Sequence, residues 1–135
     1  MKKPVKIILL SVAGLSILLL LIFFRKRGFD SFVTPSEVNE ITIHNDGGDF
    51  MTVTKQEDIN QILNYMDNIT YRRIFVPPWG GFDYCFSFYH NDQLLGDFVL
   101  AGSLADIGTK DYSYKNSNTI TLEELVQSLP NSIFK

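Results

Sequence analysis

The most prominent hydrophobic pattern in the chain is an uninterrupted apolar run near the N-terminus. Residues 7–24 read IILLSVAGLSILLLLIFF, eighteen residues without a charge. An α-helix rises 1.5 Å per residue, so this run spans about 27 Å, close to the roughly 30 Å of a hydrocarbon core. The run predicts a transmembrane signal anchor, with the apolar positions Ile7, Leu10, Leu15, Leu20 and Phe24 distributed along it.

Basic residues flank the run on both sides. Three lysines precede it, and Arg25, Lys26 and Arg27 follow it. Long cationic side chains at both ends suit the two head-group layers of a bilayer. A cleaved signal peptide is the main alternative, but it would have a shorter apolar stretch that ends at a small-residue cleavage site. Here the small pair Ala13-Gly14 lies in the middle of the run, so the pattern favours an uncleaved anchor.

The orientation of this anchor is less strongly encoded. The basic residues close to the two ends of the run are balanced, three against three, so the positive-inside comparison is nearly a tie. A long domain after the helix can be translocated whatever its charge. We therefore expect a single-pass protein of the cell membrane whose C-terminal domain is extracytoplasmic.

The rest of the chain divides by composition. Residues 1–6 form a short basic tail, and residues 25–38 read as a basic collar followed by a tether, because GFDSFVTPSEV (28–38) is polar and contains Gly and Pro. Residues 39–135 alternate apolar and polar positions and predict one small domain.

Period-two alternation predicts the strands of this domain. Ile41 and Ile43 begin a hairpin that turns at 45–48 (NDGG) and returns over 50–54, because Asn and Gly tolerate positive φ. Further strands are predicted over 69–75, which Pro77 ends, and over 82–90, which carries aromatic residues on one face. The last two strands are expected over 94–100 and 112–115.

The pairing between the strands over 82–90 and 94–100 follows from their hydrophobic faces. A loop of three residues, 91–93, places Phe86 opposite Phe98, Tyr84 opposite Leu100 and Ser87 opposite Asp97. A loop of two residues would exchange the faces of one strand. The pattern therefore predicts the three-residue loop.

Two helices are predicted from apolar stripes and N-terminal capping boxes. The first begins at Thr54 with Glu57 three residues later, and continues to about Asp67. The second begins at Thr121 with Glu124 and ends before Pro130. The order β-β-α-β-β-β-β-α indicates an α+β fold, an antiparallel sheet with one face packed on the two helices.

This layout resembles that of a loosely defined set of small, membrane-anchored, uncharacterised proteins of Gram-positive bacteria. The resemblance rests on the anchor, on ITIHN, KQEDINQILNYM and FDYCFSFYH, on a Tyr-x-Tyr and on ITLEELVQSL. It covers most of residues 39–130 in pattern. It implies extracytoplasmic placement and brings no catalytic residue with it.

The charge distribution limits the classes of partner that the domain can bind. All fifteen Asp and Glu but only six of the twelve Lys and Arg follow residue 28, which leaves that part near −9. Such a domain repels phosphate backbones, so we expect no nucleic-acid partner. The single Cys85 cannot form an internal disulfide, and no Cys/His spacing is typical of a metal site, so no cofactor or metal is expected.

Catalytic patterns are weak. His44 and His90 lie beside predicted turns, Cys85 has no cation next to it in the sequence, and Ser103 lacks the Gly-x-Ser-x-Gly context. The glycine pairs at 47–48 and 80–81 lack the spacing and the lysine of nucleotide loops.

The candidate contact residues are therefore those of a binding surface. Arg72 and Arg73 form the one cationic pair of an acidic domain, a few residues before Trp79 in VPPWGG, and Tyr71 adjoins them. A guanidinium can bind a carboxylate or phosphate or stack on an indole, although pairing with the domain's own acids is the more common use.

The function predicted from these features is a non-catalytic, membrane-tethered, extracytoplasmic domain that binds a protein or a component of the cell envelope. A narrower alternative is an immunity or inhibitor protein that blocks a toxin or a cell-wall enzyme. A regulator that faces the cytoplasm and an enzyme are weaker alternatives.

Overall fold

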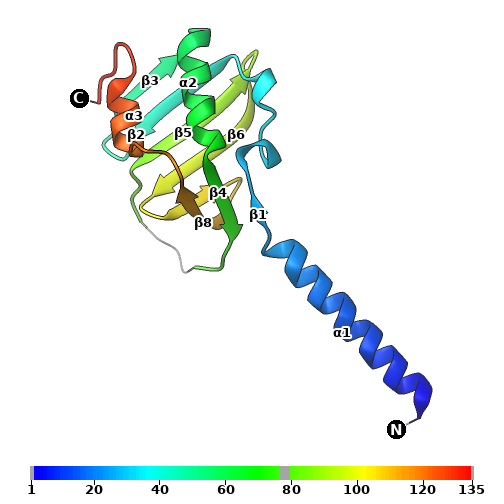
Figure 1. Ribbon diagram of the computed structural model, residues 1–135. Coiled ribbons are helices and arrows are strands. Elements are labelled where there is room, and N and C mark those ends of the chain that lie inside the picture. The colour runs from blue at the N-terminus through cyan, green and yellow to red at the C-terminus, as the bar shows by residue number, and fades with distance from the viewer. Residues whose placement is uncertain (1, 77–79, 135) are drawn as a thin grey trace.

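The computed structural model describes residues 2–76 and 80–134. Its first element, α1 (Lys3–Phe23), is a helix of 21 residues that is exposed along its length and is long and apolar enough to cross a membrane. Figure 1 shows α1 projecting away from a domain formed by the rest of the chain. The predicted apolar helix is therefore confirmed, with a start four residues earlier than the apolar run.

The domain is α+β, as predicted from the sequence. Its elements are β1 (Lys26–Arg27), β2 (Glu40–Asn45), β3 (Phe50–Val53), α2 (Gln56–Asp67), β4 (Ile69–Arg73), β5 (Tyr84–His90), β6 (Gln93–Ala101), β7 (Leu104–Ile107), β8 (Lys110–Asn116) and α3 (Leu122–Ser128), with 3-10 turns η1 (Phe29–Ser31) and η2 (Pro35–Glu37).

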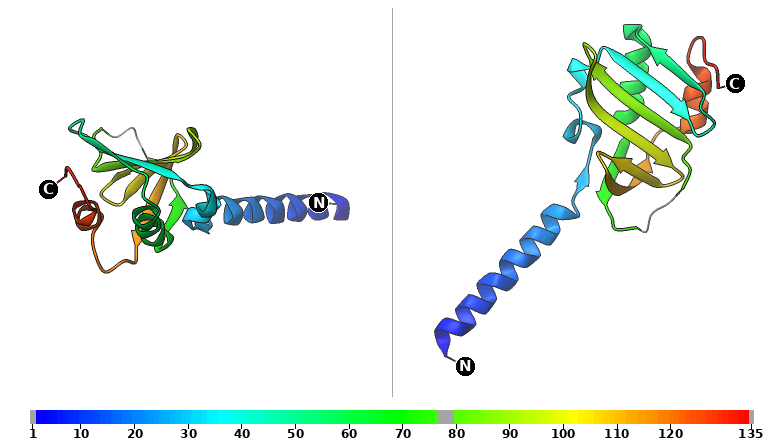
Figure 2. Two further views of the ribbon diagram at one scale, coloured as in Figure 1. Left: turned by 90° about the horizontal axis from the view of Figure 1, so that it is seen from above. Right: turned by 180° about the vertical axis from the view of Figure 1, so that it is seen from behind.

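The strands form one antiparallel sheet in the order β1-β4-β8-β7-β6-β5-β2-β3. Helices α2 and α3 lie on the same side of this sheet, as the view from above in Figure 2 shows. The opposite side is seen in the second view of Figure 2, where the strands lie in front of the helices. We call these two sides the helix face and the open face.

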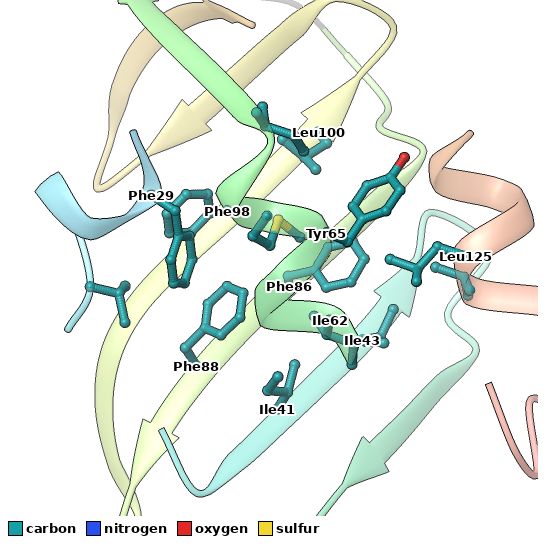
Figure 3. Packing of buried hydrophobic residues seen from close by; sticks show 14 of the residues in the cluster. Phe29, Ile41, Ile43, Ile62, Tyr65, Phe86, Phe88, Phe98, Leu100 and Leu125 are labelled. Atoms are coloured by element: carbon teal, nitrogen blue, oxygen red, sulfur yellow. The ribbon is translucent and has the colours of Figure 1, made fainter. Parts of the chain in front are cut away.

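The core lies between the sheet and the two helices, as predicted. Ile62 and Met66 of α2 and Leu125 of α3 are at most 1% exposed and pack onto Phe86 and Phe98 of the sheet. Figure 3 shows Phe98 and Phe88 on the side of the core next to Phe29, and Phe86 beside Tyr65 on the side toward Leu125. The stripe that predicted α2 is therefore the face that stabilises the sheet.

Segment 28–38 is part of this core, which corrects the expectation of a tether. Phe29 and Val33 are 1% and 3% exposed, and the Phe29 ring lies 4.8 Å from that of Phe88. The Phe32 ring contacts Tyr112 edge-on at 5.3 Å. The Gly, Pro and Ser residues that resemble a linker instead form the two 3-10 turns, which direct four apolar side chains inward: Phe29, Phe32, Val33 and Val38.

The expected pairs of β5 and β6 are confirmed, but not the expected loop. Phe86 lies opposite Phe98, and Ser87 opposite Asp97. Asn91 and Asp92, at φ 47° and 67°, form a two-residue turn, and a β-bulge restores the face alternation. Leu95 is the extra residue, because Gly96 pairs with Phe88 and Leu94 with Tyr89. A hairpin turn with two residues at positive φ matches the strand twist, so the register change occurs in the strand.

Two strands were not predicted. β1 arises from the basic collar, where Lys26 pairs with Arg72 and Arg27 with Tyr71. β7 has the sequence LADI, in which Ala and Asp are weak strand formers, and it is joined to β8 by a tight turn at Gly108-Thr109, both at positive φ. Both strands are set by pairing with their neighbours rather than by their own alternation.

The two predicted capping boxes have different outcomes. At α3, the Thr121 hydroxyl accepts from the Glu124 N–H at 3.1 Å, and the Glu124 carboxylate accepts from the Thr121 N–H at 3.0 Å. At α2 the prediction is wrong, because the helix begins one residue later, with Lys55 at the cap position and no side-chain cap. Glu57 instead lies 3.5 Å from the Lys55 ammonium.

Candidate functional site

An acidic cleft lies where several strand ends and turns meet the start of α3. Its volume is ≈ 740 Å³. We call it the acidic cleft. It is lined by Asn45, Asp46, Gly47, Phe82, Asp83, Tyr84, Gly102, Ser103, Tyr114, Asn116, Thr121, Leu122 and Glu123.

Asp83 is fixed at the rim of the acidic cleft by backbone bonds. Its own N–H donates to the Leu100 carbonyl at 2.8 Å, and its carboxylate accepts from the Gly102 N–H at 2.9 Å. Gly102 opens the turn between β6 and β7 at φ 58°, a conformation that glycine adopts without strain. The turn therefore holds one carboxylate oxygen and leaves the other free for a ligand.

Asp46 reaches the acidic cleft from the turn between β2 and β3. The Asn45 side chain caps this turn by accepting from the Asp49 N–H at 3.0 Å. Gly81 lies close by at φ 73°, and a Cβ there would be 3.3 Å from the Asp46 carboxylate. Gly81, the second glycine of VPPWGG, thus has two roles: it forms the left-handed bend before β5, and its lack of a side chain leaves room for Asp46.

Glu123 enters from the first turn of α3. The capping box at Thr121 fixes where the helix begins and so where the side chain of Glu123 stands. Leu125 and Val126 of the same helix are buried, which holds α3 against the sheet. The third carboxylate of the acidic cleft is therefore positioned by an element far from the other two in sequence.

Two tyrosines of the helix face form the aromatic part of the acidic cleft. Tyr84 is half-buried, and its ring packs edge-on against Phe134 at 5.6 Å. Burial, and then the negative charges of Glu123 and Asp83, raise its pKa. Burial and the charge of Asp83 raise the pKa of Tyr114 to about 12. Both phenols therefore remain protonated at neutral pH and can donate hydrogen bonds.

The acidic cleft selects for positive charge. Its lining contains three carboxylates and three aromatic rings, and no Lys, Arg or His occurs among those lining residues. Carboxylates attract a cation directly, and the faces of aromatic rings attract it through their quadrupoles. Phosphates and other anions are repelled by the same groups.

Of the residues predicted to form the contact surface, the three that the structure describes do not share one exposed surface. Tyr71 is fully buried and its pKa is raised by burial, so as a surface contact it is a wrong prediction. Arg72 and Arg73 point to opposite faces of β4, because successive side chains of a strand alternate. Arg72 is exposed on the open face, and Arg73 is half-buried on the helix face. Trp79 lies outside the described residues.

The candidate nucleophile and histidines are held in structural contacts. Cys85 is 2% exposed, and burial together with the Asp97 carboxylate raises its pKa to about 12. Its thiol lies 3.1 Å from Asp97, as a donor. The His90 ring is 2.6 Å from the Glu37 carbonyl, and the His44 ring packs on Phe82.

Few local patterns in the sequence indicate the acidic cleft. Its carboxylates come from a hairpin turn, a strand entrance and a helix start, at positions 46, 83 and 123. Each is an ordinary place for an acid, since turn acids cap backbone and helix N-termini favour negative charge. The pairing of β2 with β5, which places Asn45 opposite Tyr84, and the packing of α3 on the sheet bring the three together.

Comparison with protein families, with curated proteins and with solved structures finds no match to this chain. The resemblance to small anchored proteins of Gram-positive bacteria therefore stays a prediction.

Proposed function

We propose that this protein is a membrane-tethered, non-catalytic binding domain, and that its acidic cleft receives a Lys- or Arg-bearing segment of a protein partner in the cell envelope. The observation that carries the proposal is the cleft of ≈ 740 Å³ with three carboxylates and three aromatic rings in its lining and no basic residue. A pocket of this size is in the range of small-ligand and side-chain sites.

The membrane part of the proposal rests on α1. The helix is exposed and apolar over 21 residues, so removing it from water is favourable. As an anchor it would hold the domain at the membrane, with the domain on the extracytoplasmic side. The described residues that line the acidic cleft include none from α1 or β1, and its three carboxylates are exposed, which leaves it accessible to a partner.

A binding role is favoured over catalysis by the contents of the acidic cleft. Catalytic sites typically combine a nucleophile or a base with a group that orients it. The only thiol, Cys85, is buried with a raised pKa, and the histidines are outside the lining. The carboxylates and phenols that are present suit recognition of a cation.

The same acidic cleft also supports the narrower alternative of an immunity or inhibitor protein. Asp46, Asp83 and Glu123 are exposed, so they can approach a partner's surface without rearrangement of the domain. A cationic active-site groove of a toxin or a wall enzyme would be complementary to them.

The first experiment tests the topology. Intact cells that carry the full chain with a C-terminal tag are treated with a protease, and the tag is followed by blotting. Removal of the domain is the expected result. Protection in intact cells, with digestion after lysis, would contradict the extracytoplasmic placement.

The second experiment tests the acidic cleft. The full chain in lipid nanodiscs is titrated with a lysine-rich peptide at low and at high salt. Asp83→Asn keeps the acceptor for Gly102 but removes the charge, and Glu123→Gln removes a second charge. Asp92→Asn, in the exposed turn between β5 and β6, removes one charge elsewhere and is the control.

The proposal expects that Asp83→Asn combined with Glu123→Gln weakens peptide binding by at least about tenfold. Asp92→Asn should change binding by less than about twofold, because an exposed charge away from the site is screened by salt. Equal losses in the cleft and control variants would show that only the net charge of the domain attracts the peptide, and the acidic cleft would lose its assignment.

A further inference from the structure

Two arginines that form no ion pair among the described residues lie at the point where α1 enters the domain. Pairing of β1 with β4 places Arg27 opposite Tyr71, and Arg73 is two residues farther along the same strand. Both arginines are therefore on the helix face of the sheet. Figure 1 shows β1 between the end of α1 and β4.

Both guanidinium groups converge on one buried ring. The guanidinium carbons of Arg27 and Arg73 lie 5.8 Å and 5.6 Å from the centroid of Tyr112, which is 2% exposed. Arg27 also donates to the Tyr112 hydroxyl at 3.2 Å. Two like charges that share one ring repel each other, so an anion between them would be stabilised by both.

Part of the hydrogen-bonding capacity of this pair is not used among the described residues. The Nε atoms of Arg27 and Arg73 are buried and have no hydrogen-bond partner among the described residues. The ion pair that the described residues form, Lys55–Glu57, is elsewhere. A buried N–H without an acceptor costs free energy, and a bound oxyanion would supply the acceptor.

Aromatic side chains border the arginine pair on the side of α1. The Arg73 guanidinium lies 5.2 Å from the ring of Phe23, the last residue of α1. Phe75, which is 76% exposed, stacks on Phe23 at 5.4 Å, and Phe24 contacts both rings edge-on. Exposed phenylalanine rings are apolar, so contact with the acyl region would remove their surface from water.

We propose that Arg27 and Arg73 bind the phosphate group of an anionic phospholipid in the leaflet next to the domain, while Phe23, Phe24 and Phe75 contact its acyl region. The guanidinium fork matches phosphate oxygens in a bidentate geometry. A soluble phosphate would use the arginines but not the exposed aromatic rings, and so the structure favours the lipid. The site rests on insertion of α1, which is part of the proposed function, and is independent of the acidic cleft.

The test uses the full chain reconstituted in phosphatidylcholine vesicles that contain a small fraction of spin-labelled phosphatidylglycerol or spin-labelled phosphatidylcholine. The measured quantity is the relative association constant of the two labelled lipids with the protein. Arg73→Met keeps an apolar side chain over Phe23 and Tyr112 and removes the charge. Arg72→Met, the neighbouring residue on the open face, makes the same chemical change and is the matched control.

Wild-type protein should prefer phosphatidylglycerol, and Arg73→Met or Arg27→Met should reduce that preference by about tenfold. Arg72→Met should reduce it by no more than about twofold, because diffuse attraction is screened within a Debye length. Near-UV circular dichroism of each variant checks that the domain remains folded. Arg73→Met removes an Nε without a partner among the described residues, whereas Arg27→Met also removes the bond to the Tyr112 hydroxyl, so Arg73→Met is the decisive variant.

Three results would overturn the site. Equal effects of Arg72→Met and Arg73→Met would show diffuse attraction by the basic collar. Displacement of the labelled lipid by millimolar inorganic phosphate, added to the wild-type protein, would show a soluble phosphate site instead. Normal flotation with the vesicles but no lipid preference would remove the arginine site alone, whereas failure to float would remove the anchor as well.

Discussion

Segment 28–38 packs onto the sheet at Gly96, so adding one methyl group at Gly96 should lower the free energy of unfolding. A Cβ at Gly96 would lie 2.5 Å from Cγ2 of Val33 and 3.3 Å from the Phe98 ring. Val33 is 3% exposed and cannot move into solvent without leaving the core. The substitution Gly96→Ala therefore tests whether the segment is docked as the structure shows.

The magnitude follows from two opposing effects. Gly96 does not have a positive φ, so alanine there would by itself stabilise the protein by about 0.4–1 kcal/mol through the unfolded chain. Overpacking of a filled core costs about 1–3 kcal/mol. We expect the free energy of unfolding to fall by about 1–2 kcal/mol, since the side chains of Val33 and Phe98, both in the core, must give way.

A double-mutant cycle isolates the contact. Val33→Ala removes the atom that a Cβ at Gly96 would meet, and by itself it should cost about 1.5–3 kcal/mol as lost apolar burial. In the double variant the new methyl group fills part of the space that Val33 vacates. The loss of unfolding free energy in the double variant should therefore be smaller, by about 1–2 kcal/mol, than the sum of the losses in the two single variants.

The assay is urea unfolding of the full chain in detergent micelles, followed by near-UV circular dichroism, which reports the domain rather than α1. Gly80→Ala is the control, because nothing lies within 4 Å of a Cβ there and its φ is not positive. It should be neutral or slightly stabilising. Additivity of Gly96→Ala and Val33→Ala within about 0.5 kcal/mol would refute the docked segment and restore a tether over 28–38.

Two further predictions concern the caps and the thiol. Thr121→Ala should lower the free energy of unfolding by about 0.5–2 kcal/mol, because it removes the bond to the Glu124 N–H, whereas Thr54→Ala should change it by less than about 0.5 kcal/mol. Urea unfolding compares the two, and equal losses would contradict the cap assignment. Burial and the Asp97 carboxylate raise the pKa of Cys85 from 9.0 to about 12, so iodoacetamide should label the folded chain slowly near pH 8. The pKa of Cys85 is higher in the folded chain than in the unfolded chain, so the folded state favours the protonated thiol. The stability that depends on this protonated thiol is complete below pH 9.0 and is lost as the pH rises to about 12. Asp97→Asn should speed labelling of the folded protein, and labelling of the wild-type chain at the rate of an exposed thiol would show that the pKa is not raised.

The sequence by itself determined the elements whose own residues carry the signal. The apolar run defined α1, because burial of backbone in a membrane needs one long uncharged helix. The stripe at Ile59, Ile62 and Met66 defined α2, and alternation defined β2 and β5. The pairing of Phe86 with Phe98 could be derived as well, because a slip by one residue would expose an entire apolar face.

Tertiary structure alone decided the features that depend on a neighbour. β1 and β7 are strands because other strands pair with them, and segment 28–38 is ordered because its apolar side chains meet the sheet. The adjacent Arg72 and Arg73 are separated by the pleat, and β1 brings Arg27 to Arg73 instead. The three carboxylates of the acidic cleft lie together only when α3 packs against the assembled sheet. Long-range pairing sets these positions, and no local pattern of a single segment records it.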